Sequence, residues 1–340
     1  MDLKKQFSAL FDTIGADPLP PRYPSVAVEL AADRITAVRL VADRKSRALK
    51  LAAVVSRRVP EGAIEVSLTK PNILDEKAVW SVVAETLHKL APRDQRISVL
   101  LPDDVARVAL LGFATLPKTR RELADLVRFR MSKSLPFKPD EAVLDLMVLA
   151  GRAPQPGAAA ASVLASFVHR GVVEQYENLF ASCGYWPGLV SLSTFEIFNL
   201  FRPRFAAKRL PDKDSLLLNV TRHYLSVLIL RDTDIIFYRC KPHLSGGASG
   251  DPMTDVRREI YTSLAFYQEK LLGRGIGRVF LRCAGLPLDP LREAVSAEAG
   301  GETEVLDPLA QVPLNGAPTL PPEEAAWAAP AIGAVAGRRA

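Results

Sequence analysis

The sequence predicts an α/β protein with two lobes built on one pattern, and three observations point to it. Residues 24–102 read as three strands, a helix and a strand, and residues 215–283 repeat that order. The segment between the copies has a different rhythm, which predicts a compact inserted subdomain. At 340 residues and 48% hydrophobic content, the chain is long enough for two or three domains. Because a repeated meander with a helical crossover restricts sheet topology, we expect pseudo-symmetric halves.

Residues 1–23 predict a short amphipathic helix and a linker. One face of this helix carries apolar side chains beside Lys4 and Lys5, and these are Leu3, Phe7, Leu10, Phe11 and Ile14. The segment GADPLPPRYP then ends the helix. Two interpretations stay open, namely a helix that docks on the body of the protein and an anchor for a membrane surface or a partner.

The first lobe is expected over residues 24–103. The stretch PSVAVELAADRITAVRLV reads as strand, turn and strand, and a third strand (49–59), a helix (75–90) and a fourth strand (95–102) follow. The first turn contains no glycine. A turn that cradles a phosphate normally needs one, because its backbone N–H groups must approach the anion closely. This turn is therefore either an ordinary hairpin or the remains of a nucleotide site.

The inserted subdomain is expected over residues 104–200 and the second lobe over residues 201–340. The insertion reads as a strand, a helix that stops before Pro136, a hairpin (142–150 and 162–168), a further helix, and a final strand and helix. The second lobe reads as three strands within 215–240, a helix (254–272) and a strand (277–283). Its glycine-rich segments lack the residue order of a P-loop or a dinucleotide fingerprint, so they predict loops.

Composition and residue spacing exclude several functions. The net charge is +6, but no basic stripe alternates with aromatic residues, so nucleic acid is not an expected partner. Three widely spaced cysteines (183, 240 and 283) and four scattered histidines predict neither a metal site nor a catalytic triad. The sequence shows no membrane-spanning apolar run and no signal-peptide core, so a cytoplasmic location is expected.

Several stretches resemble one known family. The run LPKTRRELADLVRFRMSKSLPFKPDEAVLDLMVL is similar to a stretch of PilM, the cytoplasmic actin-like protein of type IV pilus machines. The resemblance continues through SVLASFVHRGVVEQYENLFASCGYWPGLVSLSTFEIFNLF and the closing AAWAAPAIGAVAGR, and so covers about residue 24 to the end. The resemblance implies an actin-like fold of duplicated, ribonuclease-H-like βββαβ halves, an inserted FtsA/PilM-type subdomain, and a C-terminal helix that returns to the first lobe. FtsA and the cytoplasmic part of GspL share this fold.

The resemblance also implies where a nucleotide would bind. Actin-like ATPases hold ATP between their lobes with two D-hydrophobic-G turns and a third, glycine-rich turn. The corresponding positions here are the turns at Glu29-Leu30-Ala31, Asn219-Val220-Thr221 and Cys283-Ala284-Gly285. The added Cβ atoms obstruct a phosphate, and Asn219 removes a carboxylate that Mg²⁺ would need. We therefore expect a degenerate nucleotide site (Glu29, Ala31, Asn219, Thr221, Ala284, Gly285), no catalytic residue, no hydrolysis and no resident cofactor, with ATP and Mg²⁺ left open as ligands.

The implied function is that of a scaffold. A PilM-like protein lies at the cytoplasmic face of the inner membrane, binds the short N-terminal tail of a PilN-like membrane protein and links the pilus platform to its motor. The tail would occupy a groove beside the inserted subdomain, with Leu135, Pro136 and Phe137 in one wall; alternatively, these three residues only close the subdomain core. Two other functions stay open, namely a nucleotide-dependent enzyme of the actin and sugar-kinase superfamily and a GspL-like component of type II secretion.

Overall fold

The computed structural model describes residues 24–43, 48–90, 94–149, 161–243, 252–312 and 320–337. They divide into two compact units. The small unit contains the described residues of 106–173 together with 68–70, and the large unit contains the others. The helix expected in residues 1–23, with Leu3, Phe7, Leu10, Phe11 and Ile14, lies outside the described residues.

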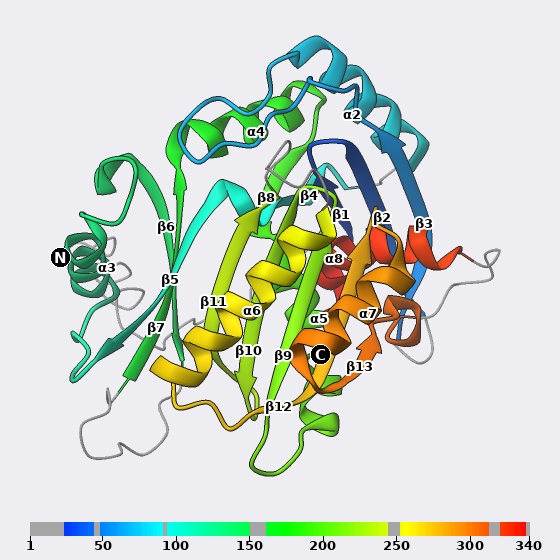
Figure 1. The fold of residues 1–340 in the computed structure, drawn as a ribbon. Coiled ribbons are helices and arrows are strands. Elements are labelled where there is room, and N and C mark those ends of the chain that lie inside the picture. Colours follow the sequence, from blue (N-terminus) through cyan, green and yellow to red (C-terminus); the bar gives the residue numbers. More distant parts are fainter. Residues whose placement is uncertain are drawn as a thin grey trace. The chain divides into compact units, whose positions relative to one another are not determined.

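The large unit contains two five-stranded sheets with the same strand order (Figure 1). The first sheet runs β3-β2-β1-β4-β8, with β1 (Val26–Leu30), β2 (Arg34–Ala42), β3 (Leu49–Arg58), β4 (Arg96–Leu101) and β8 (Trp186–Leu192). The second runs β11-β10-β9-β12-β13, with β9 (Asp214–Thr221), β10 (Tyr224–Arg231), β11 (Asp234–Pro242), β12 (Ile276–Ala284) and β13 (Glu302–Val305). In both sheets the first three strands are antiparallel and the last two join in parallel. This confirms the predicted pseudo-symmetric α/β fold.

The duplication is longer than the βββαβ order that the sequence predicts. Each half continues through a second helix, a fifth strand and a third helix. The helices of the first half are α2 (Glu76–Leu90), α4 (Arg170–Ser182) and α5 (Ser193–Lys208), and those of the second are α6 (Pro252–Lys270), α7 (Leu288–Ala299) and α8 (Pro322–Ala336). Short 3₁₀ turns lie at Asp103–Val105 and Pro308–Ala310. Each half is therefore a βββαβαβα repeat.

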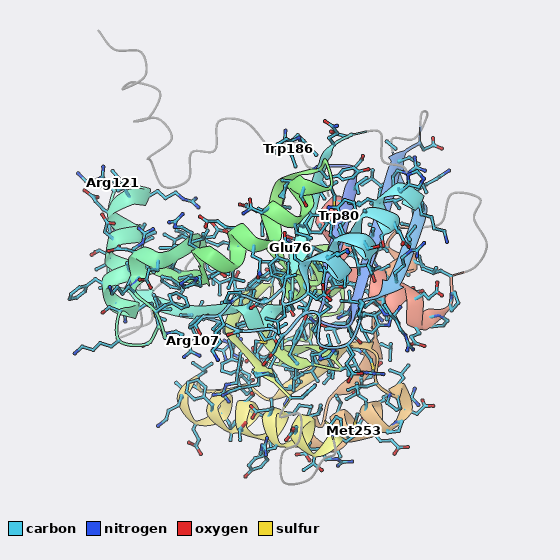
Figure 2. The ribbon with its side chains drawn as sticks, turned by 90° about the horizontal axis from the view of Figure 1, so that it is seen from above. Glu76, Trp80, Arg107, Arg121, Trp186 and Met253 are labelled. Atoms are coloured by element: carbon cyan, nitrogen blue, oxygen red, sulfur yellow. The ribbon has the colours of Figure 1, made fainter. Side chains whose placement is uncertain are left out.

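The small unit is a three-stranded antiparallel sheet packed against one helix. The strands β5 (Ala106–Phe113), β6 (Ala142–Leu149) and β7 (Ala161–His169) run in the order β5-β7-β6. Helix α3 (Arg120–Met131) begins with a capping box between Thr119 and Glu122, and a 3₁₀ turn at Pro139–Glu141 precedes β6. Figure 2 labels Arg107 on β5 and Arg121 in the first turn of α3.

Among the described residues, no helix has the length and apolarity that crossing a membrane requires.

The contact-defined boundaries of the insertion differ from the expected 104–200. Strand β8 pairs in parallel with β4, and α5 packs on α8, so both elements belong to the large unit. The described insertion therefore ends at residue 173. Apolar alternation predicts a strand near Trp186–Leu192, but it contains no information about which sheet that strand joins.

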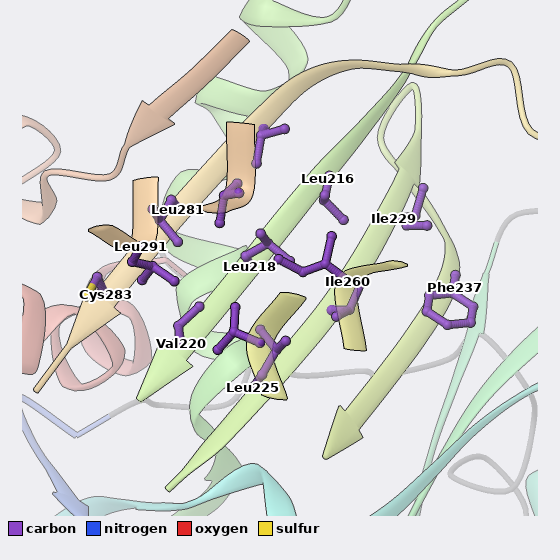
Figure 3. Close-up of a cluster of buried hydrophobic side chains, with 14 of the residues drawn as sticks. Leu216, Leu218, Val220, Leu225, Ile229, Phe237, Ile260, Leu281, Cys283 and Leu291 are labelled. Carbon is purple, nitrogen blue, oxygen red and sulfur yellow. The ribbon is translucent and has the colours of Figure 1, made fainter. Parts of the chain in front are cut away.

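The core of the second sheet explains why β9 is apolar along its length. All eight residues of β9 are buried, because helices cover both faces of this strand. Leu216, Leu218 and Val220 pack with α6 and α7 on one face (Figure 3). On the other face, the α5 ring of Phe205 lies 4.7 Å from that of Phe280 in β12.

Helices α5 and α8 pack against each other and contact strands of both sheets. The small residues of α8 make this close packing feasible. A Cβ on Gly333 would lie within 2.6 Å of the Glu196 carbonyl carbon in α5. The Ala/Gly composition of the C-terminal helix is thus a requirement of its contact with α5.

Candidate functional site

The six residues of the expected nucleotide site come from the ends of three strands. Glu29 and Ala31 lie at the end of β1, Asn219 and Thr221 at the end of β9, and Ala284 and Gly285 at the end of β12. Thr221 is the register partner of Ala284 in the sheet. In open α/β sheets, ligands bind at the carboxyl ends of parallel strands.

A buried arginine that the sequence analysis did not single out connects the first and second turns. The Arg282 side chain is fully buried in β12 and donates from Nη1 to Asn219 Oδ1 at 2.8 Å. Its Nη2 lies 3.7 Å from Glu29 Oε2, and its Nε donates to the Ala326 carbonyl oxygen in α8 at 2.9 Å. One guanidinium therefore contacts both halves of the duplicated fold. The signal in the sequence is a cation inside the otherwise apolar run VFLRCA.

Hydroxyl groups satisfy the carboxylate and amide around this arginine. Ser193 Oγ donates to Glu29 Oε1 at 2.6 Å, and Asn219 Nδ2 donates to Thr194 Oγ1 at 2.8 Å. Burial raises the pKa of Glu29, although the Arg282 charge and the Ser193 hydrogen bond oppose the rise. Glu29 and Asn219 are therefore engaged by protein groups.

A second buried carboxylate, Asp103, organises the same region. It accepts from the Thr194 backbone N–H at 3.0 Å, from the Thr194 hydroxyl, and from Ser226 Oγ at 2.6 Å. Burial raises its pKa despite these bonds. Because Thr194 lies in the first turn of α5 and Ser226 lies in β10, Asp103 connects the end of β4 to the second sheet. Its position directly after an apolar strand was the available sequence signal.

The first two turns also contact each other. Asp33 Oδ1 lies 3.3 Å from His223 Nε2, which joins the turn after β1 to the turn after β9. Burial acts to raise the pKa of Asp33, but the close His223 ring and the Arg222 charge outweigh it and lower that pKa. Within the second turn, Thr221 Oγ1 accepts from the backbone N–H groups of His223 and Tyr224. This hydroxyl satisfies N–H groups of the turn internally.

A cleft of about 840 Å³ lies outside these turns. Its lining combines cations and carboxylates with Gly285 and Trp327, and the charged members include Arg34, Arg58, Arg222, Glu61, Glu65 and Glu323. Burial raises the pKa of a further lining carboxyl, Asp104, to about 7. Gly285 has a φ of +82°, and a Cβ there would lie 2.9 Å from the Trp327 ring, so only glycine fits.

Divalent-cation chemistry fits the donors at the turns poorly. Asn219 is neutral, and Glu29 has the Arg282 guanidinium as its charged neighbour. Mg²⁺ prefers carboxylate oxygens and retained waters, and a nearby guanidinium repels a metal ion. In the described part of the chain, no group of three or more His, Cys, Asp or Glu side chains has a metal-binding arrangement.

The three residues expected at the partner site follow α3 in the small unit. Leu135 and Phe137 are half-buried and pack against the core of that unit, whereas Pro136 is exposed. The Phe137 ring meets His169 edge to face, with centroids 5.3 Å apart. Leu135 and Phe137 therefore pack as in the alternative that the sequence left open, in which they close the subdomain core. Pro136 stays accessible.

Structural comparisons identify the fold. A PilM–PilN type IV pilus biogenesis complex contains a chain similar to this one, with a TM-score of 0.76 and 18% identity over 93% of this chain and 99% of that chain. A Bacteroides thetaiotaomicron protein with an actin-like ATPase fold and unknown function has a TM-score of 0.48 and 8% identity, over 85% of this chain and 92% of that chain. The cytoplasmic domain of EpsL, an inner membrane component of the type II secretion system of Vibrio cholerae, has a TM-score of 0.48 and 11% identity, over 89% of this chain and 93% of that chain.

No protein-family model matches the sequence, and no curated protein does. The likeness in structure nevertheless extends over nearly the whole chain. Together with the duplicated sheets, it confirms an actin-like fold of the PilM type.

Proposed function

We propose that this protein is a scaffold of a type IV pilus assembly platform. In this role it lies at the cytoplasmic face of the inner membrane, binds the N-terminal tail of a PilN-like membrane protein, and links the platform to its motor. One observation carries the proposal. Over 93% of its length, this chain has the fold of a chain from a PilM–PilN type IV pilus biogenesis complex. The resemblance of residues 116–149 and 162–201 to PilM in sequence is a separate argument for the same role.

We further propose that the scaffold does not hydrolyse ATP. Support comes from the closed network around Arg282, which engages Glu29 and Asn219 with protein groups. The contact between Asp33 and His223 joins the two turns that would otherwise have to receive phosphates. A nucleotide held at the cleft would lack both the glycine turns and the carboxylate pair that activate it in an ATPase.

The proposed tail site includes the Leu135-Pro136-Phe137 segment. A short tail buries little area, so it needs a preformed surface where backbone hydrogen bonds and a few side-chain pockets supply the affinity. Pro136 fixes the chain direction and is accessible, and the half-buried Phe137 ring offers one apolar edge. A single aromatic contact of this kind contributes about 1–3 kcal/mol to binding.

Isothermal titration calorimetry tests the tail site. The titrant is the N-terminal peptide of a PilN-like single-span membrane protein from the same organism. We expect binding to the wild type and at least about tenfold weaker binding to Phe137→Ala. Phe129→Ala, which removes an exposed ring from the same unit, is the matched control and retains the affinity. Circular dichroism checks that each variant is folded.

The possible outcomes distinguish the scaffold function from the role of Phe137 in the tail site. A wild type that does not bind the peptide contradicts the scaffold function. Equal binding to the wild type and Phe137→Ala removes Phe137 from the site and leaves the PilN-like partner in place. A loss of affinity in Phe129→Ala that matches the loss in Phe137→Ala would indicate a general effect on the small unit.

A further inference from the structure

Helix α3 exposes apolar side chains on the face opposite its core. Leu123, Val127 and Met131 pack inward against the sheet of the small unit. On the outer face, the Phe129 side chain is 80% exposed and Leu126, one turn earlier, is 37% exposed. Among the described large apolar residues, only Leu272 is as exposed as Phe129. Exposure of an aromatic ring to water is unfavourable, so the transfer of Phe129 into an apolar surface would lower the free energy.

Basic residues surround this helix. Residues 118–138 contain seven cations and two acids, a net charge of +5 in a chain whose total is +6. The seven are Lys118, Arg120, Arg121, Arg128, Arg130, Lys133 and Lys138. Net positive charge therefore surrounds the helix on which Phe129 and Leu126 are exposed.

Intramolecular contacts already engage the two acids and some of the cations. Glu122 completes the capping box with Thr119, and Asp125 lies 3.6 Å from Arg128. Arg120 pairs with Asp145 at 3.0 Å, and Arg130 donates to the Gly112 carbonyl oxygen.

Four exposed cations remain available for a partner. Lys118, Arg121, Lys133 and Lys138 form no ion pair with another described residue. Lys118 and Arg121 lie at the start of α3, and Lys133 lies just beyond its end. Free positive charge therefore lies at both ends of the helix that exposes Phe129 and Leu126.

We propose that the outer face of α3 binds an anionic membrane surface, with Phe129 inserted at the headgroup boundary. Each basic residue near an anionic bilayer contributes about 1 kcal/mol, which is roughly a fivefold change in binding, and an aromatic ring is favoured at this depth. A stable protein–protein interface normally buries about 800 Å² on each partner. Two exposed apolar side chains provide little of that area, whereas a bilayer needs no complementary pocket. These features favour lipid over an acidic protein.

Vesicle flotation of the full-length chain tests this surface. One vesicle set contains phosphatidylcholine alone, and the other also contains phosphatidylglycerol at about 30%. We expect binding to the anionic set that weakens as salt rises. Phe129→Ser should weaken it about tenfold, and the double variant Arg121→Glu/Lys133→Glu at least about twentyfold.

Matched controls come from exposed positions of the large unit. Tyr261→Ser removes a ring that is 65% exposed in α6, and Lys89→Glu/Lys241→Glu reverses the same number of charges. Both controls should bind the anionic vesicles nearly as the wild type does. Circular dichroism verifies that each variant is folded.

Two results would overturn the proposal. The first is a wild type that floats with neither vesicle set. The second is a pair of α3 variants that bind no more weakly than their controls, which would assign the binding to another part of the chain. The inference is independent of the scaffold function, because Phe129→Ser should keep its affinity for the PilN-like peptide in calorimetry, whichever way flotation turns out.

Discussion

Replacing Arg282 by methionine should destabilise the large unit in a pH-dependent way. The variant loses the hydrogen bonds to Asn219 and to the Ala326 carbonyl oxygen, at about 1 kcal/mol each. It also leaves the Glu29 carboxyl buried without its cation. At pH 7, protonating a carboxyl with an ordinary pKa of 4.5 requires about 3.4 kcal/mol, which is the upper limit of this second contribution. The total loss is therefore about 2–5 kcal/mol.

The sign of the pH dependence follows from the pKa of Glu29. Burial already raises that pKa in the folded protein, and removing Arg282 raises it further. A carboxyl whose pKa is raised by folding stabilises the folded state below its unfolded pKa, and this contribution is lost as pH increases through the folded value. The difference between wild type and variant should thus grow as pH increases from 4.5 to 7 and shrink toward 4.5.

Urea denaturation at several pH values measures this effect, with intrinsic tryptophan fluorescence as the signal. The double variant Arg282→Met/Glu29→Gln supplies the control, because it removes the buried acid together with the cation. We expect it to be more stable than Arg282→Met at pH 7 and to show the same pH slope as the wild type or a smaller one. A destabilisation of Arg282→Met below about 1 kcal/mol, or one that is independent of pH, would refute the role assigned to this arginine.

Three further results are expected. Gly333→Ala should cost at least about 3 kcal/mol in denaturation, because the new methyl group meets the Glu196 backbone; a cost below that of a surface substitution would contradict the packing. His223→Gln should cost at most about 1 kcal/mol, since its contact with Asp33 is partly exposed. Because the pKa of Asp33 is lowered, that cost should be present in full above pH 3.8 and decline below it, as pH falls through the lowered pKa. Purified protein should release phosphate from Mg-ATP no faster than buffer, and turnover that Glu29→Ala abolishes would favour an enzyme.

Local patterns in the sequence predict the elements of this fold better than their connections. The period-two alternation around Glu29 and the helical period of α6 are properties of a few neighbouring residues, so both halves can be recognised. That β8 joins β4 depends on pairing between Trp186–Leu192 and Arg96–Leu101, which lie about 90 residues apart in the sequence. No local pattern encodes this pairing, and the expected boundary at residue 200 extended too far for that reason.

The candidate site was predictable to the same extent. The turn positions of Glu29, Asn219 and Gly285 follow from the repeat and from the family resemblance. The roles of Arg282 and Asp103 depend on contacts between distant segments, such as the 2.8 Å bond to Asn219 across 63 residues. A charged residue within an apolar strand signals a buried partner, but it does not identify which residue that partner is.

The position of α8 has a consequence for synthesis of the chain on the ribosome. This helix packs on β1 and β2, yet it is made long after them. At about 5–20 residues per second, some 15–60 seconds separate the emergence of β2 from that of α8. During that interval, one face of the nascent first sheet has no native cover. The first sheet can therefore complete its native packing only after residues 322–336 have been made.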